Sequence, residues 1–321
     1  MQKLERVNGF LDLDKYYEEV KRIQGYSDFD LFLDEFIKES YYSFGHYWLN
    51  INGEYYYYKW TPDIYEELIV SECAKLLNID AVEYDLAIFR ETEGVISKSY
   101  RKYGYIYFSG MDILYDYLID ENNHESLKQM GCDLIHLQEL HTNSDKAEYL
   151  NNLEVIWQAL EYRYKKLKRN APINELMEGL IKYFCLNILI GQYDAFPQNF
   201  EIGESKDNIY LAPYYDGSQS FGKQCYEPSQ SMSVSYEDRN TNNYRVLEEF
   251  FKISSQDNIN VFMEMYNTLT VDTFLNILKN VEEKIGKSLP EMTKKRIIER
   301  YIANREDIER VINKERVNGM R

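Results

Sequence analysis

The spacing of apolar residues changes along this chain of 321 residues. Residues 1–40 follow a helical period of about 3.6. Residues 47–50 and 54–60 are instead runs of aromatic and β-branched side chains, joined across Asn52 and Gly53. Asn-Gly between two such runs is typical of a β-hairpin. The sequence therefore predicts an N-terminal helical segment followed by a hairpin.

A helix and two more strands follow the hairpin. Asp63 and Glu66 have the spacing of a capping box, which predicts the start of a helix over residues 64–77. Residues 82–90 and 94–100 have the composition of strands. This region therefore predicts a small antiparallel sheet with one helix.

From Asp112 onward the spacing is mainly helical. The exception is a strand-like insertion at 199–202 and 209–212. The polar stretch 217–243 has no period and is predicted to be a long loop. This order of elements predicts an α+β fold with two lobes, joined near residues 98–107, and ligands favour the cleft between two lobes.

Composition and charge exclude several classes of protein. The chain is 44% hydrophobic, but no apolar run approaches the roughly 20 residues that cross a bilayer. The first residues mix charges throughout, unlike a secretory signal, so we expect a cytoplasmic protein without a membrane partner. A net charge of −17 disfavours direct binding of nucleic acid, while a local pocket for a nucleotide remains compatible with it. The scattered cysteines and histidines lack the spacing of a zinc site.

The sharpest chemical pattern follows the apolar helical stretch 173–190. Asp194 and Asn199 are five residues apart in a turn with Pro197, as in the catalytic loop of phosphotransfer enzymes. There a carboxylate accepts the proton of the acceptor hydroxyl, and an amide oxygen nearby helps to hold Mg²⁺. This spacing is also found in ordinary turns, so it supports phosphotransfer only together with other matching residues.

Asp216 and Gly217 supply the next part of that combination. A carboxylate followed by glycine, after a strand-like insertion and before a long polar loop, suits a second Mg²⁺ ligand. Alone, Asp-Gly is more often a simple turn. The order of Asp194, Asn199 and Asp216 is what favours phosphotransfer.

A phosphate donor also needs a cation, and Lys59 is the predicted one. Lys59 shares a strand face with Tyr57, so its ammonium can face the cleft and meet phosphate oxygens. Such a lysine needs a carboxylate to orient it. Glu67 is the predicted partner. Glu66 is the alternative because it lies nearer the apolar stripe, unless it serves the helix cap instead. Without the downstream residues, Lys59 would be interpreted as a solvated strand lysine.

Gly45 is a poor match to a phosphate-binding loop, because such loops usually contain two or three glycines. Neither the P-loop pattern nor the dinucleotide-binding glycine pattern occurs in the sequence.

Taken together, these residues resemble those of HipA-like protein kinases, and within them the short CtkA-like members. The resemblance extends from about Gly45 to the end of the chain. It rests on Lys59, Glu67–Glu72, Tyr84–Leu86, Val95–Ser99, Asp194, Asn199–Phe200 and Ala212–Asp216.

The resemblance implies a bilobal protein-kinase-like α+β fold with a small antiparallel-sheet N-lobe and a mainly helical C-lobe. It divides the chain into a helical segment at 1–40, an N-lobe at 41–103 and a C-lobe at 104–321. It also implies ATP and Mg²⁺ as cofactors, a serine or threonine of a protein substrate as acceptor, and an antitoxin-type partner as a further possibility.

The same resemblance implies a role for each site residue. Asp194 would be the catalytic base, Asn199 and Asp216 the metal ligands, Lys59 the phosphate contact oriented by Glu67, Gly45 part of the nucleotide-binding loop, and Ser97, Lys98, Ser99 and Tyr100 the adenine-binding hinge. Ser43 occupies a place where members of the family autophosphorylate.

Two positions depart from the family pattern. Phe196 and Gln198 stand where a histidine and a basic or small polar residue are usual, so no cation follows Asp194 and slow transfer is expected. Two alternatives stay open. One is a phosphotransferase with a cationic small-molecule acceptor, which the acidic surface would suit. The other is a toxin-type regulatory module that binds nucleotide and transfers little or nothing.

Overall fold

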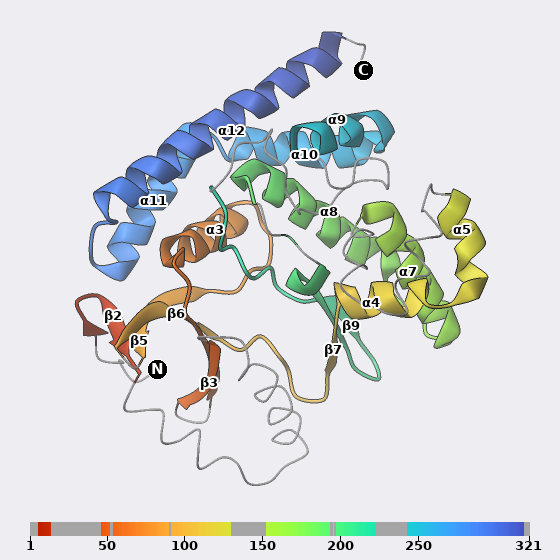
Figure 1. Cartoon of the computed structure of the whole chain (residues 1–321), viewed down its shortest axis with the longest axis horizontal. Coiled ribbons are helices and arrows are strands. Elements are labelled where there is room, and N and C mark those ends of the chain that lie inside the picture. Colours follow the sequence, from red (N-terminus) through yellow and green to blue (C-terminus); the bar gives the residue numbers. More distant parts are fainter. Residues whose placement is uncertain are drawn as a thin grey trace.

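The computed structural model places a sheet-containing N-terminal part beside a mainly helical C-terminal part (Figure 1). It describes residues 6–13, 46–51, 54–89, 91–129, 152–192, 195, 197–221 and 243–317. This arrangement is the α+β order of elements that the sequence predicts.

The N-terminal part is built on a six-stranded sheet in the order β1-β2-β5-β6-β4-β3. The strands are β1 (Arg6–Val7), β2 (Phe10–Asp12), β3 (His46–Ile51), β4 (Glu54–Lys59), β5 (Tyr84–Phe89) and β6 (Thr92–Lys98). The predicted hairpin is confirmed, because β3 and β4 pair antiparallel with Ile51 opposite Glu54. One pairing differs from the expected antiparallel pattern, since β2 and β5 run parallel.

The helical prediction for the start of the chain is wrong where the structure describes it. Residues 6–12 form a hairpin, β1–β2, that turns at Asn8 and Gly9, both with positive φ. Leu11 and Leu13 are buried in the cluster on one face of the sheet, and this two-residue alternation is that of a strand. Residues 1–5 and 14–45, which include the rest of the predicted helical segment 1–40 and also Ser43 and Gly45, lie outside the described residues.

The predicted helix after the hairpin is confirmed as α3 (Ile64–Leu76). Its predicted capping box is wrong, since the Asp63 side chain makes no capping hydrogen bond and Glu66 binds Arg296 instead. Nearly every residue of α3 is buried. The sheet and α11 (Val271–Ile285) both contact the helix, which explains why only Glu72, Lys75 and Leu76, toward its end, are exposed or partly exposed.

The C-terminal part is mainly helical and carries a second, three-stranded sheet, β7-β8-β9. Its elements are α4 (Gly110–Leu118), η2 (Glu121–Asn123), α5 (His124–Gln129), α7 (Leu153–Lys166), α8 (Ile173–Ile190), η4 (Pro197–Asn199), α9 (Asn243–Ile253), α10 (Gln256–Thr268), α11, α12 (Glu291–Val317), β7 (Ile106–Ser109), β8 (Glu201–Glu204) and β9 (Ile209–Leu211). The predicted insertion is confirmed as β8–β9, whereas β7 comes from a stretch that was predicted only to join the lobes.

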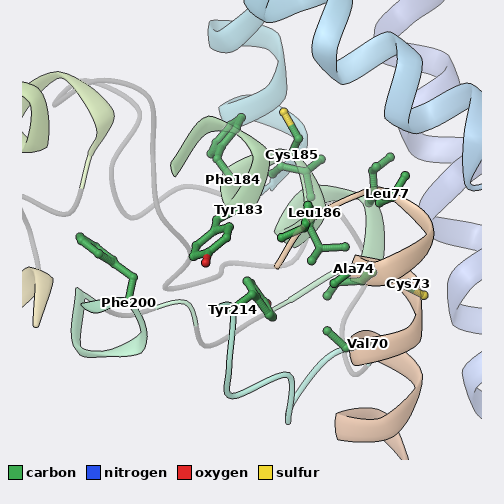
Figure 2. Packing of buried hydrophobic residues seen from close by; sticks show 14 of the residues in the cluster. Val70, Cys73, Ala74, Leu77, Tyr183, Phe184, Cys185, Leu186, Phe200 and Tyr214 are labelled. Atoms are coloured by element: carbon green, nitrogen blue, oxygen red, sulfur yellow. The ribbon is translucent and has the colours of Figure 1, made fainter. Parts of the chain in front are cut away.

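One hydrophobic core runs through both parts of the molecule (Figure 2). Val70 and Ala74 of α3 belong to the same cluster as Tyr183 and Leu186 of α8, and Tyr214 lies with them. The backbone of Tyr214 also pairs with the segment before β5, through hydrogen bonds to Asp80 and Val82. The strand-like residues just before Asp216 are therefore fixed against the N-terminal part.

None of the helices in the described ranges is both long and apolar enough to cross a membrane.

Candidate active site

Lys59, the last residue of β4, forms a buried ion pair with Glu67 of α3. Its Nζ donates to Glu67 Oε1 over 2.7 Å. Glu67 is completely buried, and Lys59 is 9% exposed. Tyr56 and Tyr58 pack in the cluster on the other face of the sheet, so alternation turns Tyr57 and Lys59 toward the cleft.

Asp216 joins this pair from the C-terminal part. Lys59 Nζ donates to Asp216 Oδ1 and, over 3.1 Å, to Ser218 Oγ. Ser218 in turn donates to Asp216 Oδ1 over 2.7 Å. The ammonium is therefore held by Glu67 on one side and, about 150 residues later in the sequence, by the carboxylate of Asp216 and the hydroxyl of Ser218.

Gly217 explains why glycine follows Asp216. Its backbone N–H donates to Glu67 Oε2 over 2.8 Å. A Cβ at this position would lie 2.7 Å from Cβ of Val70, so a larger residue has no room beside α3. The Asp-Gly pair is thus an interlobe contact rather than a simple turn.

The electrostatics of this cluster keep Lys59 charged. Burial alone would lower the pKa of Lys59, but the charges of Glu67 and Asp216 outweigh it and raise the pKa above its ordinary value. The ammonium is therefore a permanent cation at neutral pH.

The structure shows which of the two adjacent glutamates is the partner of Lys59. Glu67 binds Lys59, whereas Glu66, which is 1% exposed, accepts a hydrogen bond from Arg296 of α12. Neighbouring helix positions point about 100° apart, so only one of two adjacent carboxylates can face the cleft.

The residues predicted as a hinge line the same cleft as Lys59 and Asp216. These hinge residues are Ser97, Lys98, Ser99 and Tyr100. The Ser99 N–H donates to the carbonyl of Tyr55, which continues the β4–β6 ladder to the end of the sheet. The Lys98 side chain is exposed at the rim and pairs with Glu54 over 2.5 Å.

Sequence reasoning missed Glu201, which anchors the hinge to the second sheet. Glu201 accepts from Tyr100 OH over 2.6 Å and from Arg101 over 2.5 Å, and all three residues line the cleft. Tyr215 stacks on Tyr100 with ring centroids 5.8 Å apart. No local pattern pointed to Glu201, because its partners lie about a hundred residues earlier in the chain.

Gln192 is a second missed residue, and it links the turn after α8 to Asp216. Gly191 ends α8 in the left-handed conformation, and the next side chain, Gln192, is 1% exposed. Gln192 Nε2 donates to the backbone carbonyl of Asp216 over 2.9 Å, and Gln192 Oε1 accepts from Ser220 over 3.2 Å. The only signal for Gln192 in the sequence was its position two residues before Asp194.

Asn199 and Asp216 line one small cavity together with Gln192 and Ala195. A carboxylate and an amide oxygen are donors that suit Mg²⁺, which usually takes one or two protein ligands along with phosphate oxygens and water. Within the described ranges, no group of three or more His, Cys, Asp or Glu side chains is placed to hold a metal on its own. Asn199 and Asp216 therefore fit a metal that also binds phosphate oxygens and water.

Asp194 and Phe196 lie outside the described residues. Their neighbours Ala195 and Pro197 are buried, and the Gln198 side chain is exposed while its carbonyl accepts from Tyr215 OH over 2.5 Å. The role of Asp194 as a base remains a prediction.

Comparisons with known proteins bear on the fold. No protein-family model matches the chain, and no curated protein matches it. Among solved structures, the Helicobacter pylori proinflammatory kinase CtkA is similar, with a TM-score of 0.59 and 15% identity over 84% of this chain and 90% of that chain. A structure of HipA from Shewanella oneidensis MR-1 with HipB and operator DNA gives a TM-score of 0.43 and 12% identity over 81% of this chain and 58% of that chain.

The similarity to CtkA spans both parts of the molecule. It agrees with the fold that the resemblance to HipA-like kinases implies. The chain therefore has the bilobal fold of a CtkA-like kinase.

Proposed function

We propose that this protein is an ATP- and Mg²⁺-dependent phosphotransferase that acts on serine or threonine of a protein substrate. The observation that carries the proposal is the buried ion pair of Lys59 and Glu67, which meets Asp216 in a cleft of a kinase-like fold.

Lys59 would bind the phosphates of the nucleotide, and Glu67 would orient it. An ammonium held in place before the nucleotide arrives needs little reorganisation at the moment of transfer. The low exposure of both side chains strengthens their attraction to each other and to phosphate oxygens.

The hinge residues and Tyr57 would form the nucleotide subsite. Tyr57, Val82, Tyr84 and Tyr215 give the cleft apolar and aromatic walls suited to a base. Glu201 holds Tyr100 and Arg101, which also line the cleft, so the subsite is fixed by a buried ion pair.

Asn199 and Asp216 would hold Mg²⁺, which when bound supplies positive charge to the phosphates. Gln192 fixes the backbone of Asp216 from the turn that leads to Asp194. Asp194 would accept the proton of the acceptor hydroxyl. The proposal also includes an antitoxin-type partner and autophosphorylation at Ser43, and these two parts rest only on the resemblance to HipA-like kinases.

The decisive test is incubation of the purified protein with γ-labelled ATP and Mg²⁺, alone, with a protein fraction or with a metabolite fraction. Intact-mass measurement detects phosphate on the protein, and the label is then counted in each added fraction. Gain of whole phosphates on protein supports the proposal. Label on small metabolites instead would favour a small-molecule acceptor. A nucleotide-dependent rise in melting temperature without any transfer would favour the binding module.

Matched variants tie the outcome to the site. Lys59→Met and Asp216→Asn should each lower transfer by about 10²–10³-fold, the usual loss when one preorganised charge is removed. Lys182→Met is the control, because Lys182 is a partly exposed lysine that pairs with Glu178 on the surface of α8. Full activity of the Lys59 or Asp216 variant would overturn the assigned roles.

A further inference from the structure

Two adjacent carboxylates of α3 are fixed by different parts of the molecule. Glu67 binds Lys59 of the sheet, and Glu66 binds Arg296 of α12. Any shift or rotation of α3 that breaks the contact between Glu66 and Arg296 must also move Glu67. The position of Glu67 is therefore coupled to a helix near the end of the chain.

The contact between Glu66 and Arg296 holds a carboxylate that is almost completely buried. Glu66 is 1% exposed, and Asp63 lies on the same side, with its Oδ1 3.9 Å from Arg296 Nη2. Burial raises the pKa of Glu66, as does the charge of Asp63, while Arg296 opposes both. Without the guanidinium, Glu66 must take up a proton or move toward water, and moving turns α3.

The same α12 also fixes the other half of the site. Asn304 Nδ2 donates to the carbonyls of Ile188 and Leu189 over 2.9 and 3.0 Å, at the last turn of α8. Gly191 and Gln192 follow directly, and Gln192 binds the backbone of Asp216. Arg296 and Asn304 are eight residues apart, or about 12 Å along a helix. One rigid helix therefore contacts the supports of both Glu67 and Asp216.

From this geometry we propose that Arg296 is a positioning residue: through Glu66 it sets α3 so that Glu67 meets Lys59, while Asn304 on the same helix fixes the end of α8, from which Gln192 reaches the backbone of Asp216. The inference rests on the proposed function for its consequence in catalysis. The coupling itself is a property of the protein without nucleotide.

The test measures the pairing of Lys59 directly, by labelling the purified protein with an amine-reactive ester and quantifying the modified Lys59 peptide by mass spectrometry. A buried, charged and paired lysine reacts slowly. We expect Arg296→Gln to raise the labelling rate of Lys59 about threefold to tenfold, the scale of coupling between contacting residues. Arg296→Lys should return it toward the wild-type value.

Arg310→Gln is the matched control. Arg310 is also on α12 and also pairs with a nearly buried carboxylate, Asp307, which is 5% exposed, but that pair lies on another turn of the helix. Loss of stability alone would raise Lys59 labelling in both variants. Specific positioning raises it only in the Arg296 variant.

A double variant tests whether Arg296 affects Lys59 through Glu67. Glu67→Gln should by itself raise Lys59 labelling, and adding Arg296→Gln should then change it little, because both act on one contact. Additive effects, or equal labelling of wild type, Arg296→Gln and Arg310→Gln, would overturn the inference.

A parallel assay of phosphate transfer keeps the two proposals separate. If the wild type transfers phosphate, Arg296→Gln should lower kcat by about tenfold, within the range of coupling between contacting residues. Adenosine, which lacks phosphates, should bind both forms equally. If the wild type transfers none, the proposed function fails, and the labelling result still decides the role of Arg296.

Discussion

The backbone N–H of Gly217 donates to the carboxylate of Glu67 over 2.8 Å, so the residue after Asp216 is bound directly to α3. This contact and the ion pair of Lys59 use the two oxygens of one carboxylate. Glu67 therefore joins the sheet, the helix and the Asp216 turn at one point.

Gly217→Ala should destabilise the protein by about 1–3 kcal/mol, the usual range for overpacking a core. The added Cβ would lie 2.7 Å from Val70 Cβ, which cannot move without its backbone. Urea unfolding measures the loss. In the control Gly179→Ala, the new Cβ meets only the flexible end of Leu211, so a smaller loss is expected. Equal losses would contradict the interlobe role of Gly217.

Lys59→Met should lower the free energy of unfolding by about 3–5 kcal/mol, because it leaves the buried carboxylate of Glu67 without its cation. The double variant Lys59→Met/Glu67→Leu removes both charges and should recover much of the loss. Urea unfolding gives the coupling energy between Lys59 and Glu67 when it is measured for the wild type, both single variants and the double variant. A double variant as unstable as the sum of the single ones would show that the pair is not coupled.

Glu201→Gln should weaken binding of adenosine and lower stability by about 1–3 kcal/mol, since Tyr100 and Arg101 lose a charged acceptor inside the cleft. Titration calorimetry measures the binding. Glu178→Gln is the control, since Glu178 is 64% exposed and pairs with Lys182 at the surface. Unchanged adenosine affinity in Glu201→Gln would show that the hinge does not contact the base.

Stability should fall steeply above about pH 10. Burial raises the pKa of the buried tyrosines Tyr84 and Tyr214 well above the ordinary value of 10.0. Below pH 10 both states keep these phenols protonated, so they contribute no pH dependence there. Above it the unfolded chain releases protons that the folded state retains, and the equilibrium shifts toward unfolding.

Ultraviolet absorbance of phenolate and circular dichroism, followed together during an alkaline titration, check this expectation. The buried tyrosines should ionise only as the fold is lost, in one cooperative step. Complete ionisation of all 31 tyrosines while the circular dichroism stays native would contradict it.

The elements that the sequence predicted well are those fixed by local chemistry. Asn52-Gly53 between aromatic runs defined the β3–β4 hairpin, and alternation placed Tyr57 and Lys59 on the cleft side. The same Asn-Gly signal is present at residues 8–9, where both residues have positive φ. It was overlooked because β1 and β2 are too short to show a strand period against the helical spacing of residues 1–40.

Contacts between distant segments could not be predicted in the same way. Glu66 was assigned to a helix cap because a capping box is a local pattern, but its partner Arg296 lies 230 residues later. Glu201 similarly depends on Arg101. Which of two adjacent glutamates faces Lys59 is decided by tertiary packing, and one sequence without that packing leaves both possible.

The short hairpin β1–β2 covers part of the outer edge of β5, through the pairing of Leu11 with Ala87 and of Asp12 with Ile88. A form of the protein that begins after residue 13 would leave these backbone donors and acceptors of β5 open to solvent. Open strand edges pair readily with other chains. We therefore expect these few residues to limit self-association, and shortened forms should be checked for aggregation before any loss of activity is ascribed to the site.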